Sequence, residues 1–329
     1  MHVTVTEATT DEFEEATAPF RRELFAHCYR MSGSLTDAED LVQETYVRAW
    51  RSFDRFEGRS SVRTWLYRIA TNVCLSALER ARRRPLPSGL GAPSDAPDAP
   101  VAPPPDGVRW LEPVPDRLVL DDRGDPGEVV AARHRVRLAL VAALQLLPPR
   151  QRAALVLRDA LGLSAAETAE LLGVSVVAVK SLLQRARLRV AEASLSDADI
   201  VEPTAPGARR VLDRYMAAFE RSDAAEVAHL LAEDAVLETT GTTTWFSGKA
   251  TCAPFVADQA IGSPGDWRMV PLEANGQLGA AAYHRGTGRT YLPFAIVVLA
   301  TTGSHLTRIT LFTDRGLFAR FGLPTRLEG

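Results

Sequence analysis

The 329-residue sequence has little of what membrane, secreted or metal-dependent proteins need. No apolar run approaches the roughly 20 residues of a membrane-spanning helix, and the acidic N-terminus has no apolar stretch typical of a signal peptide. There are only three cysteines, Cys28, Cys74 and Cys252, and their wide spacing predicts reduced core thiols in a cytoplasmic protein. Neither a Gly-rich phosphate loop nor a cluster of metal ligands is present, so we expect no enzyme, no cofactor and no bound metal.

Neither acidic nor basic residues are in large excess, because the net charge is only −3. The two kinds of charge are nevertheless segregated along the chain. Residues 85–129 carry 3 basic and 9 acidic side chains, whereas residues 130–192 carry 10 basic and 4 acidic ones. The basic block has the charge expected of a nucleic-acid-binding domain. The acidic block is rich in Pro, Ala and Asp, which disfavours a packed core of its own.

Two amphipathic helices, 36–50 and 61–84, are predicted in the first quarter of the chain. Thr36 and Glu39 have the spacing of a capping box at the start of the first helix, and apolar side chains recur at i, i+3, i+4 and i+7 in both. The polar face of the second helix is rich in Arg, Asn and Thr and ends in four arginines. Two helices that pack on each other would explain the apolar stripes, but the polar face is typical of a helix that lies along nucleic acid.

This stretch resembles region 2 of the extracytoplasmic-function (ECF) sigma factors of bacterial RNA polymerase. The resemblance rests on the DAEDLVQET run (37–45), on Trp50, on SFDRFEGRSSVRTWLYRIATN (52–72) and on the closing arginines. With a preceding helix that begins at Glu14 or Glu15 and ends at about Met31, it predicts a three-helix domain over residues 15–84. Residues 1–14 are predicted to be disordered.

The resemblance implies which polar residues bind partners. The outward face of the first helix would bind the clamp of the largest polymerase subunit through Asp37, Asp40, Leu41, Gln43, Glu44 and Arg48. The following loop and helix would hold the melted −10 element, in which extruded bases gain stacking and hydrogen bonds. The residues expected there are Asp54, Arg55, Phe56, Arg63, Arg68, Asn72, Arg80, Arg82, Arg83 and Arg84, the last three as phosphate contacts.

Residues 85–128 are predicted to be an extended, partly polyproline-like linker. In sigma factors the corresponding linker threads toward the polymerase active-site channel, and the resemblance implies that route here. The segment WLEPVPD (110–116) interrupts the linker with an aromatic residue that a spacer does not need. It is either a contact to a neighbouring domain or a binding segment of its own.

Residues 129–193 are predicted to form a helix-turn-helix domain. Ser164 and Glu167 form a second capping box, Gly173 supplies a sharp turn, and Ser175 caps a new helix. The pattern by itself also fits a plain helical hairpin, but the LPPRQR, SAAE, LLGVS, VKS and QRAR runs resemble region 4 of an ECF sigma factor. That resemblance implies contact with the polymerase flap and the −35 element. The residues predicted to face DNA are Ser175, Lys180, Ser181, Gln184, Arg185 and Arg187.

Residues 194–206 are predicted to be a short acidic linker, and residues 207–329 an α+β domain. In this domain a helix passes into a strand within residues 223–239, and four further strands follow. This part resembles the SnoaL-like cone-shaped α+β barrels, some of which are enzymes that use a buried Asp or His as a base. Four residues are expected near a pocket, namely Trp245, Trp267, Tyr283 and His284. A packing role for the tryptophans and a core role for the histidine are the alternatives.

Together these features predict two all-α domains and a SnoaL-like α+β barrel in a sigma factor that binds RNA polymerase core and promoter DNA. The C-terminal domain is expected to modulate its activity in cis, with an anti-sigma factor or a small ligand left open as further partners. The alternative is a ligand-responsive helix-turn-helix regulator that never joins polymerase. A cyclase-like enzyme with a DNA-binding appendage would need a catalytic constellation that the sequence does not show.

Overall fold

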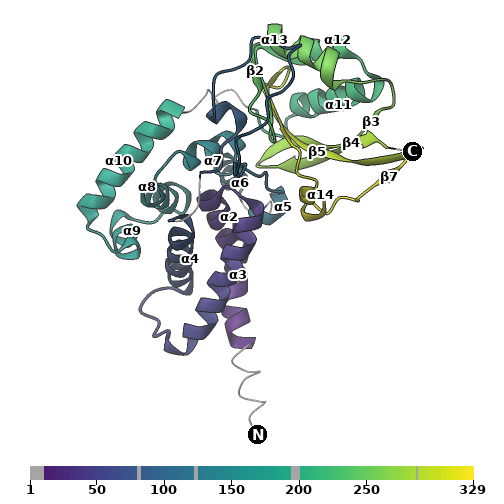
Figure 1. Ribbon diagram of the computed structural model, residues 1–329. Helices are drawn as coiled ribbons and strands as arrows, with labels where there is room; N and C mark the ends of the chain where they lie inside the picture. The colour runs from purple at the N-terminus through teal and green to yellow at the C-terminus, as the bar shows by residue number, and fades with distance from the viewer. Residues whose placement is uncertain (1–10, 80–82, 122–124, 194–200, 287) are drawn as a thin grey trace. The chain divides into compact units, whose positions relative to one another are not determined.

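The computed structural model describes residues 11–79, 83–121, 125–193, 201–286 and 288–329 (Figure 1). The chain divides into two compact units. Unit 1 comprises residues 1–84 and 117–194, and unit 2 comprises residues 85–116 and 195–329. Within the described ranges, no helix is long and apolar enough to cross a membrane.

The N-terminal half of unit 1 is all helical. Its elements are a helix over residues 11–17, η1 (Ala18–Phe20), α2 (Arg21–Ser32), α3 (Leu35–Ser52), η2 (Phe53–Arg55) and α4 (Val62–Leu78). The predicted stripes pack against one another, with Leu24, Cys28, Leu66, Ala70 and Cys74 fully buried. All three cysteines are free and buried, as predicted.

The start of α3 corrects one prediction. Ser34, not Thr36, caps the helix, because its hydroxyl accepts the backbone N–H of Asp37 at 3.0 Å. Gly33 ends the preceding helix in a left-handed conformation (φ 68°), which needs no Cβ, and the chain reverses within two residues.

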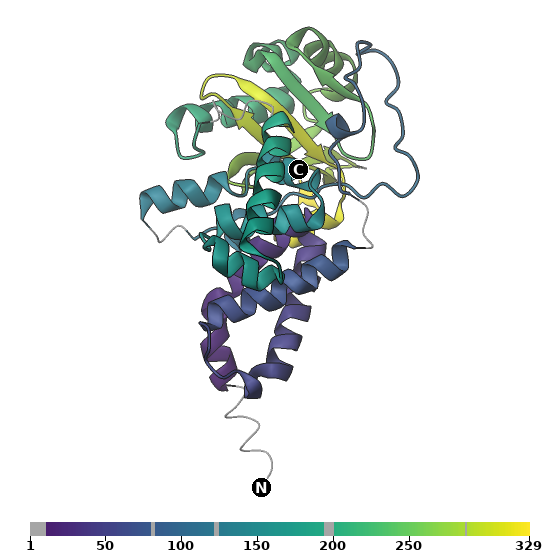
Figure 2. The same cartoon turned by 90° about the vertical axis from the view of Figure 1, so that its left-hand side faces the viewer.

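The C-terminal half of unit 1 is a set of short helices followed by a long one (Figure 2). Its elements are α5 (Asp116–Val119), α6 (Pro126–His134), α7 (Leu138–Gln145), α8 (Pro149–Leu155), the π-helical turn η4 (Val156–Ala160), α9 (Ala165–Leu172) and α10 (Val176–Ala193). The predicted capping box is present: Ser164 Oγ accepts the Glu167 N–H at 3.1 Å, and the Glu167 carboxylate accepts the Ser164 N–H at 2.7 Å. Gly173, at φ 63°, makes the turn between α9 and α10.

The described residues of unit 2 form a seven-stranded mixed sheet with helices packed on it (Figure 1). Its elements are η3 (Pro87–Gly89), α11 (Pro206–Arg221), α12 (Ala224–Leu230), β1 (Leu231–Thr239), β2 (Trp245–Ser247), α13 (Lys249–Phe255), η5 (Val256–Ala260), β3 (Trp267–Ala274), β4 (Gln277–Arg285), β5 (Thr290–Thr301), β6 (Leu306–Phe312), α14 (Gly316–Arg320) and β7 (Leu327–Glu328). The strand order is β2-β1-β6-β5-β4-β3, β7 pairs with β5, and only β1 and β6 run parallel. The predicted strand that continues a helix is β1, which follows α12 directly, and the four further predicted strands are β3 to β6. The short β2 and β7 were not predicted.

The core of unit 2 lies between α11 and the sheet. Alternate residues of β4, namely Leu278, Ala280 and Ala282, join the buried cluster, as strand geometry requires for one face of a sheet. Val211 and Tyr215 of α11 belong to the same cluster. Small alanines on the strand leave room beneath the helix, and a cavity lies in this part of the unit.

The linker segment (residues 85–116) differs from the expected free spacer, because it belongs to unit 2. Its backbone pairs with that unit: Val114 N–H donates to Asn275 Oδ1, and Asn275 N–H donates to the Val114 carbonyl, both at 3.0 Å. Apart from η3 and a few turns, the segment is extended, so most of its backbone groups have no partner of regular secondary structure and can pair with the rest of unit 2. Residues 117–121 and 125–128, also predicted to be linker, belong to unit 1, and Val201 N–H donates to the Thr301 carbonyl within unit 2.

Candidate functional site

The outward face of α3 carries most of the residues predicted to bind polymerase. Asp40, Gln43, Glu44 and Arg48 are exposed, and Arg48 forms an ion pair with Glu44 one turn before it, at 2.7 Å. Leu41 is buried, so it supports this face from the core and does not line it. Val47, which was not among the predicted residues, is 42% exposed on the same face, one turn after Gln43 and Glu44.

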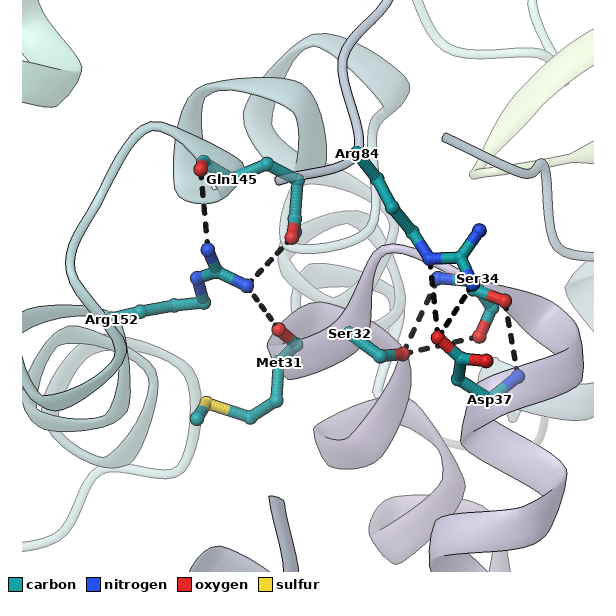
Figure 3. A network of polar contacts seen from close by, with 7 residues as sticks. All are labelled: Met31, Ser32, Ser34, Asp37, Arg84, Gln145 and Arg152. Atoms are coloured by element: carbon teal, nitrogen blue, oxygen red, sulfur yellow. Dashed lines mark hydrogen bonds and ion pairs between the residues drawn. The ribbon is translucent and has the colours of Figure 1, made fainter. Parts of the chain in front are cut away.

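Asp37 and Arg84, predicted for two different interfaces, bind each other. Arg84 Nη2 lies 2.6 Å and Nε 3.1 Å from Asp37 Oδ2, and the Arg84 side chain is only 6% exposed (Figure 3). Ser34, which caps α3, lies beside this pair. The structure therefore places Arg84 in the fold of the domain and does not present it to DNA, which corrects its expected role as a phosphate contact. The neighbouring Arg83 is exposed.

The predicted −10 surface is only partly open in unit 1. Asp54, Arg55 and Asn72 are exposed, whereas Phe56 is half-buried and packs on Trp65 at 4.9 Å between ring centroids. Arg63 donates to Glu23 Oε2 at 2.8 Å. Arg80 and Arg82 lie outside the described residues.

Arg68, the remaining residue of the −10 prediction, forms an ion pair with Glu170 of α9. A residue expected to bind the −10 element is therefore joined to a helix of the predicted −35-binding domain. Both residues are on unit 1, and the pair is solvent-exposed, so it contributes little stability by itself.

The second helix of the helix-turn-helix presents the predicted −35 residues. Ser175 Oγ caps α10 by accepting the Ala178 N–H at 3.1 Å, and Lys180, Ser181, Gln184 and Arg185 are exposed. Arg187 is exposed as well but is paired with Asp159 of η4 at 2.8 Å. Val177, which was not among the predicted residues, is 76% exposed in the first turn of α10.

A buried polar network joins the two halves of unit 1 (Figure 3). Arg152 of α8 donates to the backbone carbonyl of Met31 at the end of α2 and, at 2.6 Å, to Gln145 Oε1. Gln145 Nε2 donates to the Arg30 carbonyl at 3.3 Å. Burial lowers the pKa of Arg152 to about 10, which still leaves the guanidinium charged at neutral pH.

In unit 2, a buried carboxylate holds the linker segment. Glu238 of β1 is fully buried, and its Oε1 accepts Arg308 Nη1 at 2.8 Å and the Thr310 hydroxyl at 3.3 Å. Its Oε2 accepts the backbone N–H of Ser88 at 3.2 Å. A charge that is paired and hydrogen-bonded can be buried at tolerable cost, so Glu238 fixes the linker to the sheet.

Only two of the four predicted pocket residues line the cavity of unit 2. Trp267 and His284 belong to its wall, and their rings meet edge to face at 4.6 Å. Trp245 instead donates its indole N–H to the Gly91 carbonyl at 2.9 Å, and Tyr283 donates its hydroxyl to the Pro324 carbonyl at 2.9 Å. Strand alternation explains why only one of Tyr283 and His284 lines the cavity, because neighbouring residues of β4 face opposite sides of the sheet.

Comparison with known proteins defines the class. The chain matches the profile of Sigma-70 region 2 over residues 18–84 and that of Sigma-70 region 4 over residues 137–190. These are the parts of unit 1 that contain α2 to α4 and α7 to α10, so unit 1 holds the two conserved regions of a sigma factor.

The relatives narrow the class. The chain is 49% identical over 318 residues to the ECF RNA polymerase sigma factor SigG of Mycobacterium tuberculosis, which covers 96% of this chain and 85% of SigG. It is 34% identical over 217 residues to SigJ of the same organism, over 65% of this chain and 60% of SigJ. The crystal structure of SigJ matches with a TM-score of 0.59 at 26% identity and covers 96% of this chain and 99% of that one.

The chain belongs to the ECF RNA polymerase sigma factors. These are transcription initiation factors that bind RNA polymerase core and promoter DNA, and they are not enzymes. Unit 2 adds a SnoaL-like α+β domain, so the predicted fold and family are confirmed, and the ligand-responsive regulator is not favoured.

Proposed function

We propose that this sigma factor reads the −10 element through the loop and exposed face of α4 and the −35 element through α10, and that unit 2 regulates it by holding the linker segment. The factor would act in the cytoplasm, where promoter DNA lies. The observation that carries the regulatory part is the pairing of the linker segment with unit 2, from Ser88 on Glu238 to Val114 on Asn275.

The closed arrangement of unit 1 supports a state that is not engaged with a promoter. The −10 and −35 elements lie about 25 base pairs apart, which at a rise of 3.4 Å corresponds to about 85 Å of duplex. Arg152 of region 4 contacts Met31 of region 2, so the two regions are side by side. They would have to separate before both elements are bound at once.

The bound linker supports the same conclusion. In relatives of this family the linker between regions 2 and 4 is expected to enter the polymerase active-site channel. A linker segment whose backbone is paired with unit 2 cannot occupy that channel at the same time. Unit 2 would therefore lower transcription for as long as it holds the linker segment, and its release would be part of forming the holoenzyme.

Run-off transcription with core polymerase and the full-length protein tests this proposal. Val114→Asp places a charge at a fully buried linker position, whereas Val108→Asp places the same charge at a half-buried position in the same segment. Asn275→Gly removes the amide that accepts the Val114 N–H and tolerates the positive φ of 58° at that residue.

Val114→Asp and Asn275→Gly should raise core-dependent transcript yield several-fold over the native protein, and Val108→Asp should not. Circular dichroism and thermal melting would confirm that all variants fold. Equal or lower yields from both release variants, with unit 2 still folded, would refute regulation by linker retention. A complete absence of core-dependent transcripts from every form would refute the promoter assignment itself.

A further inference from the structure

Unit 2 contains a partly open, mainly apolar cavity of about 390 Å³, a size typical of small-molecule sites. Its wall is formed by side chains of the sheet and of α13 and η5, including Leu237, Phe255, Val256, Val297, Ile309 and Leu311. At its rim, Trp267 packs edge to face on His284 and on Phe294, with centroid distances of 4.6 and 5.0 Å. No Asp, Glu, Lys or Arg is among the described residues that line it, so the cavity favours a neutral occupant.

A phenol hydroxyl in the wall has no hydrogen-bond partner among the residues that the structure describes. Tyr215 of α11 is 1% exposed and lines the cavity, and its hydroxyl makes no hydrogen bond to any described residue. Burial alone raises the pKa of this phenol, so the hydroxyl stays protonated and available as a donor. Buried hydroxyl groups are normally satisfied, because leaving one without a partner is costly. Tyr283, in contrast, has its partner in Pro324.

The linker segment supplies part of the wall. Val101 lines the cavity, and Gln259, also in the wall, donates to the Pro97 carbonyl at 2.8 Å. On the other side of Val101, the Ala102 N–H donates to Thr244 Oγ1 at 2.8 Å, and Thr243 N–H donates to the Ala102 carbonyl at 3.0 Å. A molecule in the cavity would therefore touch the same segment that unit 2 holds.

We propose that this cavity binds a neutral, mainly apolar small molecule with a hydrogen-bond acceptor for Tyr215, and that its occupation changes how firmly the linker segment is held. A ketone or ether oxygen on an apolar ring system has this chemistry, since it accepts one hydrogen bond and otherwise buries carbon. The coupling to the linker rests on the proposed function. The binding itself does not, and it can be tested without polymerase.

The binding test uses the full-length protein and two probes of nearly equal shape, 2-acetonaphthone and 2-ethylnaphthalene. Their affinities are measured by displacement of the neutral fluorophore N-phenyl-1-naphthylamine. Tyr215→Phe should lower the affinity for the ketone between about two- and tenfold, as expected for the loss of one hydrogen bond, and leave the affinity for the hydrocarbon unchanged. Tyr283→Phe is the matched control, because it removes a hydroxyl of the same domain that lies outside the cavity, and it should change neither affinity.

Substitutions that fill the cavity provide a second, independent test of the site. Ala282→Leu on β4 and Ala260→Leu at the end of η5 each place a larger side chain in the cavity wall. Both should abolish displacement by either probe while thermal melting shows a folded protein. Undiminished binding in both variants, or no saturable binding in the native protein, would overturn the site. An equal effect of Tyr215→Phe on both probes would overturn the hydrogen bond.

The coupling is measured by hydrogen exchange of the linker amides with and without 2-acetonaphthone. Ser94 N–H, which donates to the Trp245 carbonyl at 2.8 Å, and Ala102 N–H report on the linker segment before and after Val101, the linker residue that lines the cavity. Their exchange rates should change at least several-fold on saturation, whereas amides of α3 should not respond. Saturable binding without any change at these amides would overturn the coupling and leave the linker-release test of the proposed function intact.

Discussion

The guanidinium of Arg152 donates a hydrogen bond to the backbone carbonyl of Met31, so a side chain of region 4 binds the main chain of region 2. The carbonyl belongs to the last turn of α2, where helix carbonyls lack intrahelical partners and the helix dipole favours a cation. Gln145 reinforces the contact, because it binds the Arg152 side chain (Figure 3) and also donates to the Arg30 carbonyl. The contact uses few region 2 side chains and could break without disturbing the core of that region.

Arg152→Met should therefore loosen unit 1 and free the two regions from each other. It leaves Gln145 and the Met31 carbonyl without their buried donor, so the free energy of unfolding should fall by about 1–3 kcal/mol. Arg150→Met, at an exposed position of the same helix, is the matched control and should have no effect.

Urea denaturation measures the loss of stability in Arg152→Met, and energy transfer between dyes at Gln43→Cys and Gln184→Cys measures the separation of the two regions. The native cysteines do not interfere because they are buried. Unchanged transfer efficiency in Arg152→Met would contradict the prediction.

Arg84 and Arg83 should separate a structural from a DNA-binding role. Arg84→Leu removes the buried guanidinium that binds Asp37 and should lower the free energy of unfolding by about 1–3 kcal/mol. Arg83→Leu, at an exposed position, should leave stability unchanged. It should instead reduce the salt dependence of promoter binding by the holoenzyme by about one unit of slope, as for one phosphate contact. Filter binding over a salt series measures the slope, and the opposite pattern would restore Arg84 as the phosphate contact.

The sequence was sufficient for the helices and for the family because their signals are local. The stripe of α4 and the Ser164–Glu167 capping box depend on residues within one or two turns, and both appear in the structure. The cap of α3 was misplaced because Ser34 and Thr36 are both good N-caps, and the choice was made by Gly33, which ends α2 one residue earlier.

Contacts between distant residues could not be predicted in this way. Nothing near Arg84 indicates that it pairs with Asp37, and a basic run is usually a solvated surface. The linker segment looked like a spacer by composition, because the groups that bind it, such as Glu238 and Asn275, lie 150 or more residues further along the chain. In the sequence pattern Tyr215 is one of the apolar positions of the helix that became α11. Only the tertiary structure shows that it lines a cavity.

His27 should make region 2 sensitive to mild acid. It is fully buried, and burial, with a smaller contribution from the nearby Arg30 charge, lowers its pKa from 6.5 to about 3. Because the unfolded chain binds a proton below pH 6.5 and the folded one does not, stability is present above that pH and is lost as the pH falls toward 3.

At pH 5 the loss should be about 2 kcal/mol relative to pH 7.5. Urea titrations of the native protein and of His27→Gln at both pH values measure it, and the difference between the two pH values should shrink by that amount in the variant. His134, which lies in α6 and is exposed, is the matched position: His134→Gln should keep the full pH dependence. An equal pH dependence in the native protein and His27→Gln would contradict the assignment.

The exposed face of α10 should divide into residues that read bases and residues that supply charge. Gln184 is uncharged and exposed, so Gln184→Ala should relax discrimination at the −35 base it reads, at a cost of about 1–3 kcal/mol for the preferred sequence. Lys180→Ala should weaken binding to all sequences alike and reduce the salt slope by about one. Arg187 is held by Asp159 at 2.8 Å, so Arg187→Ala should cost less DNA affinity than Lys180→Ala. Holoenzyme binding to a library of −35 variants at several salt concentrations tests all three, and an equal salt slope for Lys180→Ala and the native protein would remove Lys180 from the interface.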